Sequence, residues 1–210
     1  MAGSVKVGGA WKTVSGASVK VGGAWKTVSA GYTKVGGAWK QWYSSAIEPM
    51  ELIQTIIVPS NSSADIVFSS IPSTYQHLQL RIAMQATAAS SGTTGIRFNG
   101  DTANYTVHTY SGTDGTPSST APLGTNRIYL PGTGDKQTGA IVDIYDYAKT
   151  NKTKTLRVFG GSMHIGTSPL VRISSGLWNS TAAINSVTLT TNTMPLAAGS
   201  RFSLYGIKGQ

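Results

Sequence analysis

The sequence contains no cysteine, few charged residues and no stretch with helical spacing. Without cysteine there can be no disulfide bridge, zinc–thiolate site or cysteine nucleophile. Only 12% of the 210 residues are charged, against roughly 25% in an average globular domain. Serine, threonine, glycine, asparagine and alanine are abundant instead. We therefore expect a surface of hydroxyl and amide groups.

Long apolar runs are also missing. The first residues contain no apolar segment of the signal-peptide type. The longest aliphatic stretch, Leu52 to Val58, is interrupted by Gln54 and Thr55 and is far too short to cross a bilayer. We expect no insertion into a membrane.

Common catalytic motifs are absent as well. The sequence has no Gly-x-Ser-x-Gly elbow, no Walker loop and no His-Glu-x-x-His motif. Its three histidines, His77, His108 and His164, do not lie at ligand spacing from one another. We expect each histidine to be exposed or satisfied by a local partner, with no cofactor and no metal.

Two carboxylate patterns are candidate sites. Asp143 and Asp146 form the closest pair, and a glycosidase needs two carboxylates across a cleft. Three residues apart on a strand, they point to opposite faces, which predicts a solvated strand end. The oxygen donors of Asn99 to Asn104 could hold calcium, but they lack the acidic density of a dedicated loop. A simple turn is favoured there, and the chain is predicted not to be an enzyme.

The first 43 residues are dominated by a repeat. Ser4 to Val14 returns as Ser18 to Val28, and the core Lys-Val-Gly-Gly-Ala-Trp-Lys returns as Lys34 to Lys40. Each copy reads as two short strands joined by a Gly-Gly turn, since both central positions of a primed hairpin turn have positive φ. That register pairs a lysine with a tryptophan across each hairpin, within reach of a cation–π contact. The predicted pairs are Lys6 with Trp11, Lys20 with Trp25, and Lys34 with Trp39.

The repeats are basic. They contain six lysines and no acidic residue, and so contribute +6 of the formal net charge of +9. A nucleic-acid arm is one interpretation of this charge. The regular Gly-Gly turns and the absence of arginine favour a structural attachment module instead. A single hairpin is marginal in water, so the copies are expected to stack on each other, on a partner or on other subunits.

The strand pattern predicts the fold. Gln41 to Ile47, with Trp42, reads as a junction that seals the hairpins onto the next domain, and Glu48-Pro49 marks a boundary. We therefore expect a hairpin module at 1–47 and a second domain at 48–210. That domain shows about ten short strands and no helix, which indicates an all-β antiparallel sandwich or jelly roll. Its clearest strand runs from Tyr75 to Ala86, with strict alternation from His77 onward. Ser111 to Gly124 reads as a loop, and Gly160-Gly161-Ser162 reads as a break between two strands.

Several segments resemble virion structural proteins of tailed bacteriophages. They are Leu78 to Arg81, Phe98 to Tyr105, Leu177 to Ile184 and Ala198 to Ile207. The Lys-Val-Gly-Gly-Ala-Trp-Lys units are similar to repeats of phage tail-fibre and other appendage proteins. One departure is Ala103, where the family pattern has glycine. The resemblance implies a homotrimeric β-sandwich that hangs from the particle by its N-terminal end.

Two classes of function are expected for a protein located on the virion. The first is a non-enzymatic appendage of tail fibre or baseplate, with capsid decoration as the alternative, attached through the Lys–Trp hairpins and Trp42 to other virion proteins. The second is a carbohydrate-binding module, or a host-surface glycan site on the appendage. Exposed rings such as Tyr105, Tyr110 and Trp178 are needed for it, because sugars stack on aromatic faces. Nucleic acid is not an expected partner.

Overall fold

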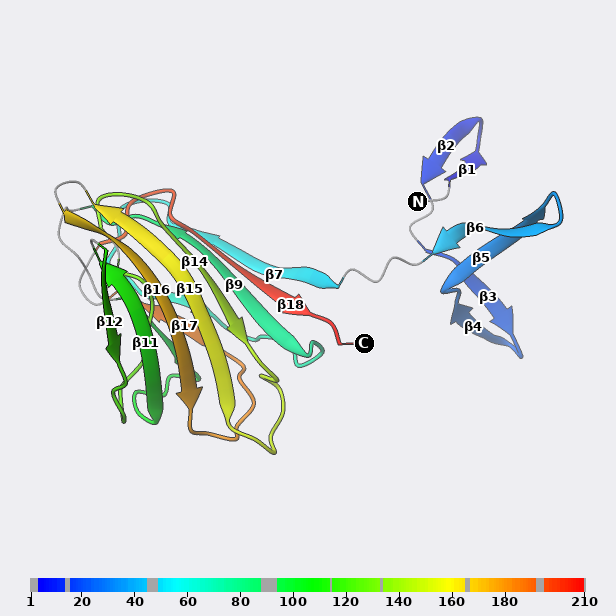
Figure 1. The fold of residues 1–210 in the computed structure, drawn as a ribbon. Coiled ribbons are helices and arrows are strands. Elements are labelled where there is room, and N and C mark those ends of the chain that lie inside the picture. Colours follow the sequence, from blue (N-terminus) through cyan, green and yellow to red (C-terminus); the bar gives the residue numbers. More distant parts are fainter. Residues whose placement is uncertain are drawn as a thin grey trace. The chain divides into compact units, whose positions relative to one another are not determined.

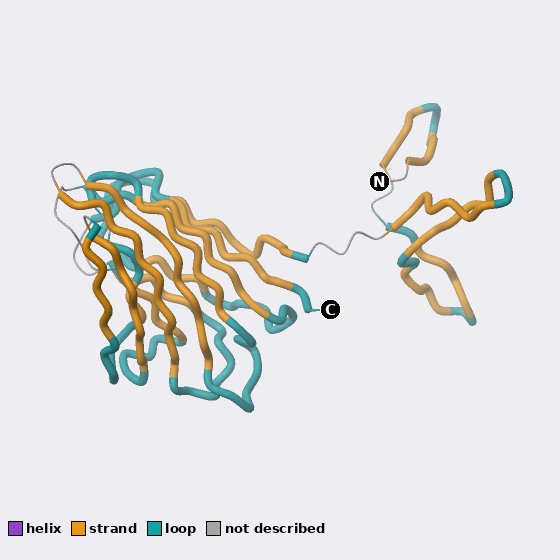
Figure 2. Tube along the Cα trace, in the orientation of Figure 1, coloured by secondary structure: helices purple, strands orange, loops and turns teal. Residues whose placement is uncertain are grey.

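The structure is a computed structural model that describes residues 4–13, 16–44, 49–87, 94–113, 115–132, 134–164, 167–191 and 195–209. The chain divides into two compact units, Met1–Glu48 and Pro49–Gln210. Every described element is a strand, as the tube in Figure 2 shows for both units. Every pairing between these strands is antiparallel. The predicted all-β class is confirmed.

The first unit consists of three hairpins. Each forms a two-stranded sheet of its own. The strands are β1 (Ser4–Val7) with β2 (Ala10–Thr13), β3 (Ser18–Val21) with β4 (Ala24–Thr27), and β5 (Ala30–Val35) with β6 (Ala38–Ser44). The predicted hairpin repeats are therefore present.

The second unit is a sandwich of two unequal sheets. The larger has eight strands in the order β12-β11-β16-β15-β14-β9-β18-β7, which lie side by side in Figure 1, and the smaller has the order β13-β10-β17-β8. The strands are β7 (Met50–Ile57), β8 (Ile66–Phe68), β9 (His77–Met84), β10 (Gly95–Phe98), β11 (Tyr105–Thr113), β12 (Thr116–Thr120), β13 (Ile128–Tyr129), β14 (Thr138–Ile144), β15 (Lys154–His164), β16 (Thr167–Trp178), β17 (Val187–Thr190) and β18 (Arg201–Ile207).

The core lies between these two sheets. On β9, Leu78, Leu80, Ile82 and Met84 are buried while the residues between them are partly or fully exposed, as the alternation predicted. The smaller sheet contributes Ile96, Phe98, Ile128, Val187 and Leu189 to the same cluster. The opposite face of the eight-stranded sheet therefore faces away from the core.

Two predicted breaks are wrong. The expected loop Ser111 to Gly124 contains the end of β11 and all of β12, which pair from Thr109↔Thr120 to Thr113↔Thr116. The expected break at Gly160-Gly161-Ser162 lies inside β15 instead. A Cβ on Gly160 would lie 2.5 Å from the carbonyl oxygen of Gly139 on the neighbouring strand. Glycine there permits close strand packing and does not end the strand.

Candidate functional site

The hairpin turns are explained by their two glycines. Gly22 and Gly23 have φ values of 61° and 84°, and the corresponding glycines of the other repeats fall within about a degree of these. Nothing lies within 4 Å of a Cβ built on any of the six, so backbone conformation and not crowding requires glycine. The primed turn fixes the register of each ribbon.

The predicted lysine–tryptophan pairing is confirmed in all three repeats. The registers place Lys6 opposite Trp11, Lys20 opposite Trp25, and Lys34 opposite Trp39. In the third hairpin the lysine Nζ lies 6.0 Å from the centre of the tryptophan ring, which is cation–π distance.

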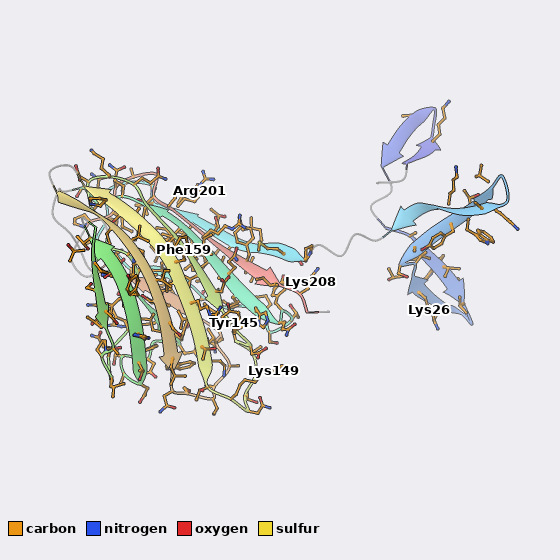
Figure 3. The ribbon with its side chains drawn as sticks, viewed as in Figure 1. Lys26, Tyr145, Lys149, Phe159, Arg201 and Lys208 are labelled. Carbon is orange, nitrogen blue, oxygen red and sulfur yellow. The ribbon has the colours of Figure 1, made fainter. Side chains whose placement is uncertain are left out.

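The indoles of the second and third hairpins are open to solvent. The exposed fraction is 72% for Trp25 and 69% for Trp39, and every residue of β3 and β4 is exposed. Lys26 is labelled on the second hairpin in Figure 3. The described hairpins thus present apolar rings and cations together, a surface suited to a slot with acidic walls. The side chains of Trp11 and Trp42 lie outside the described residues, so the predicted sealing role of Trp42 stays a prediction.

A polar network occupies part of the outer face of the eight-stranded sheet. Gln79 Nε2 donates a hydrogen bond to Asp143 Oδ1 at 2.9 Å, and Arg81 Nε donates to Gln79 Oε1 at 3.0 Å. The Arg81 guanidinium lies 5.3 Å from the ring centre of Tyr205. The Asp143 carboxylate therefore accepts a structural hydrogen bond from a neighbouring strand.

Asp146 does not lie on a strand, so the prediction that placed both carboxylates on one strand end is corrected. β14 ends at Ile144, and Asp146 has φ 48° in the following turn. Its carboxylate accepts a 2.8 Å hydrogen bond from Lys152 Nζ, and this bond lowers the pKa of Asp146. Each aspartate is therefore held by its own local partner.

The turn from Asn99 to Asn104 is built by its own hydrogen bonds. Asn99 and Gly100 both have positive φ, as the Asn-Gly signal predicted, and the third positive φ is at Asn104. The Asp101 carboxylate accepts hydrogen bonds from Trp178 Nε1 at 2.7 Å and from the main-chain N–H of Ala103 at 2.9 Å. The indole bond lowers the pKa of Asp101. These donors occupy the oxygens that calcium would need, which agrees with a simple turn.

Two of the three rings proposed for sugar stacking are buried. Tyr105 is completely buried and Trp178 is 3% exposed, and both pack against Phe98. A buried ring offers no face to a sugar, so the glycan role of these two residues is wrong. Tyr110, on the outer face, is 55% exposed.

The histidines have local surroundings. His77 Nδ1 accepts a hydrogen bond from the main-chain N–H of Asp146 at 3.0 Å, and its ring packs edge-on against Tyr145. His108 is exposed, and its Nε2 lies 3.4 Å from Ser119 Oγ. The side chain of His164 lies outside the described residues.

The exposed apolar side chains of the sheet are the feature that sequence reasoning missed. Ile141, Phe159, Val171 and Ile173 are 42–58% exposed on the outer face. Phe159 is labelled on β15 in Figure 3. The strand alternation indicated that one face was either wet or turned to another subunit, but it could not show that four apolar residues on neighbouring strands gather there.

Within the described ranges, no three His, Asp or Glu side chains gather as a metal site. The same residues include no helix long and apolar enough to cross a membrane. No known protein-family model, curated protein or solved structure matches this chain.

Proposed function

We propose that this chain is a non-enzymatic structural protein of a tailed-bacteriophage particle, a tail-fibre or baseplate appendage attached through its N-terminal hairpins. The observation that carries the proposal is the exposure of Trp25 and Trp39, each opposite a lysine on a ribbon set by a Gly-Gly turn. The resemblance of the repeats to those of phage appendages supports the same assignment.

Exposed indoles of this kind favour a partner. A tryptophan buries roughly 150–250 Å² when it is covered. Covering the exposed seven-tenths of each ring gives about 3–4 kcal/mol at ~25 cal/mol per Å², before the cost of association. Together the two rings give about 6–8 kcal/mol, which is comparable with the association cost of roughly 4–15 kcal/mol, so stable attachment needs further contacts. The six lysines add charge attraction to an acidic socket on another virion protein, an attraction that salt weakens.

The sandwich is then the projecting part. In this proposal the appendage is a homotrimer, as the resemblance implies, and capsid decoration is the alternative location. Labelling the sandwich and imaging particles by electron microscopy distinguishes the two, because label at the tail end fits an appendage and label over the capsid fits decoration. The native mass of the full chain in light scattering tests the trimer, and a monodisperse monomer overturns it.

A double substitution tests attachment. Trp25→Ala with Trp39→Ala in the full chain is expected to reduce binding to particles stripped of the protein by at least tenfold in co-sedimentation. The matched control is Thr27→Ala with Thr33→Ala, which removes exposed side chains from the same two hairpins. Binding of the tryptophan variant equal to that of the threonine control overturns the proposal.

A further inference from the structure

An apolar ridge crosses the outer face of the eight-stranded sheet. The registers set Tyr110 opposite Ile173, Ile173 opposite Phe159, and Phe159 opposite Ile141. Arg81 continues the line on β9, where it pairs with Ile141. These four apolar side chains, on β11, β16, β15 and β14, form one row perpendicular to the strands and are 42–58% exposed.

A trough runs beside the ridge, two residues along each strand. The residues of this second row are Gly112, Val171, Gly161, Gly139 and Ala83, again in register from β11 to β9. Three of the five are glycines. Gly139, Gly161 and Val171 of the trough line a groove of about 660 Å³. Ile141, Phe159 and Arg81 line it from the side of the ridge.

The fold itself does not require two of these glycines. A Cβ built on Gly112 or Gly139 meets nothing within 4 Å, and none of the three trough glycines has a left-handed φ. Glycine inside a strand weakens it, and it often marks a place where another chain or ligand approaches closely. The missing side chains therefore indicate a contact outside this chain.

We propose that the occupant of the trough is the ridge of a second copy of this chain. A two-fold axis parallel to the two rows, and midway between them, places every strand over the same strand of the partner. Each ridge residue then lies over the trough residue two positions away in its own sequence. Phe159 meets the partner's Gly161, Ile141 the partner's Gly139 and Tyr110 the partner's Gly112. Ile173 meets the partner's Val171, a contact between two apolar side chains. The surface is complementary to itself, as a two-fold contact requires.

Charge and area agree with this occupant. The same rotation sets Arg81 over the partner's Ala83 and Ser203 over the partner's Arg201, because these residues continue the two rows on β9 and β18. No two like charges face each other among these pairs. Eight strands span roughly 34 Å and seven residues of strand roughly 24 Å. The whole face thus offers about 800 Å², which is the area that each partner buries in a standard stable interface.

Exchanging ridge and trough on one strand tests the register. Gly139→Ile in the full chain fills the trough and is expected to weaken self-association at least tenfold in sedimentation equilibrium. The double variant Gly139→Ile with Ile141→Gly exchanges the ridge and trough residues on β14. The new isoleucine then lies over a glycine of the partner again, so association is expected to return to within a few-fold of the original. Thr155→Ile adds the same side chain at an exposed position of the outer face away from the groove and is expected to change nothing. Circular dichroism confirms that each variant is folded.

Three results overturn this pairing: an original chain that stays monomeric, a Gly139→Ile chain that associates normally, or a double variant as impaired as the single one. If the original chain is a monomer and its Gly139→Ile variant no longer binds particles, the groove binds another protein of the particle. That result also overturns the proposed pairing. The inference is independent of attachment by the hairpins, whose own test is the tryptophan substitution. A trimer formed through another surface is compatible with this contact, and the two together give six copies.

Discussion

The buried hydroxyl of Tyr105 offers a direct test of how the two sheets are joined. The residue is completely buried. Its Oη accepts a 2.8 Å hydrogen bond from the main-chain N–H of Phe98 on the smaller sheet, and it lies 3.3 Å from the carbonyl oxygen of Asp101, to which it donates. Replacing Tyr105 with Phe keeps the ring and removes both bonds.

The expected cost depends on the group left behind. Phe98 is also completely buried, so its N–H loses a partner in a place that water does not reach. A buried donor without an acceptor costs about 1–3 kcal/mol. In a protein of this size that corresponds to a fall in the melting temperature of roughly 2–12 °C.

Urea unfolding followed by circular dichroism measures this change. The control is Tyr110→Phe, which removes a hydroxyl from an exposed ring on the same strand and is expected to change the free energy of unfolding by less than about 0.5 kcal/mol. Equal stability of the two variants would refute the conclusion that the Tyr105 hydroxyl links the two sheets by a hydrogen bond.

The same residue gives a pH dependence with a definite sign. Burial raises the pKa of Tyr105 to about 12, above the value of about 10 that the unfolded chain has. Below pH 10 the Tyr105 hydroxyl is protonated in both the folded and the unfolded state, and its contribution to stability is fully present. Between pH 10 and 12 the unfolded state loses the proton first, so stability falls by up to about 1.4 kcal/mol per pH unit from this group. Tyr105→Phe is expected to show a shallower alkaline decline.

Three further predictions concern other parts of the chain. Gly176→Ala is expected to destabilise the sandwich by about 1–3 kcal/mol in urea unfolding, because a Cβ there lies 2.6 Å from Ile128 Cδ1; an unchanged midpoint contradicts this. Gly22→Ala is expected to broaden the nuclear magnetic resonance signals of its hairpin without moving the sandwich melting temperature, because φ at that position is 61°. The hydrogen bond from Trp178 lowers the pKa of Asp101. The stability that this carboxylate contributes is therefore present above the ordinary pKa of an aspartate and is lost as the pH falls below it. Asp101→Asn is expected to flatten this acid decline in a pH series of urea unfolding.

Local patterns in the sequence predicted much of the fold. The alternation of β9 was readable because one face is buried, and the Gly-Gly turns were readable because two positive φ values leave few other residues possible. The Asn99-Gly100 turn was predicted by the same reasoning. In each of these cases the cause lies within a few residues of the signal.

The remaining features depend on contacts that residue composition and alternation do not show. Residues 111–120 have the composition of a loop, yet Ser111 and Ser118 pair across β11 and β12 with their hydroxyls 2.9 Å apart. Trp178 reads as a surface ring because its hydrogen-bond partner Asp101 lies 77 residues away in the sequence. Tyr105 is close to Phe98 and Asp101 in the sequence, but its composition does not show that its ring turns into the core. The ridge escaped prediction for the same reason, since its members come from four strands that only the sheet order brings together.

If the hairpins attach the chain as proposed, their number determines how attachment responds to the loss of a single hairpin. Their Lys–Trp pairs are equivalent and recur every fourteen residues on one chain. Once one hairpin is bound, the other two are held near neighbouring sockets at a high effective concentration, so contacts that are weak singly combine into durable avidity. If the hairpins attach the chain as proposed, loss of one copy shortens the residence time of the bound chain without releasing it. A repeat of this kind allows the number of copies to adjust binding strength while the contact itself stays the same.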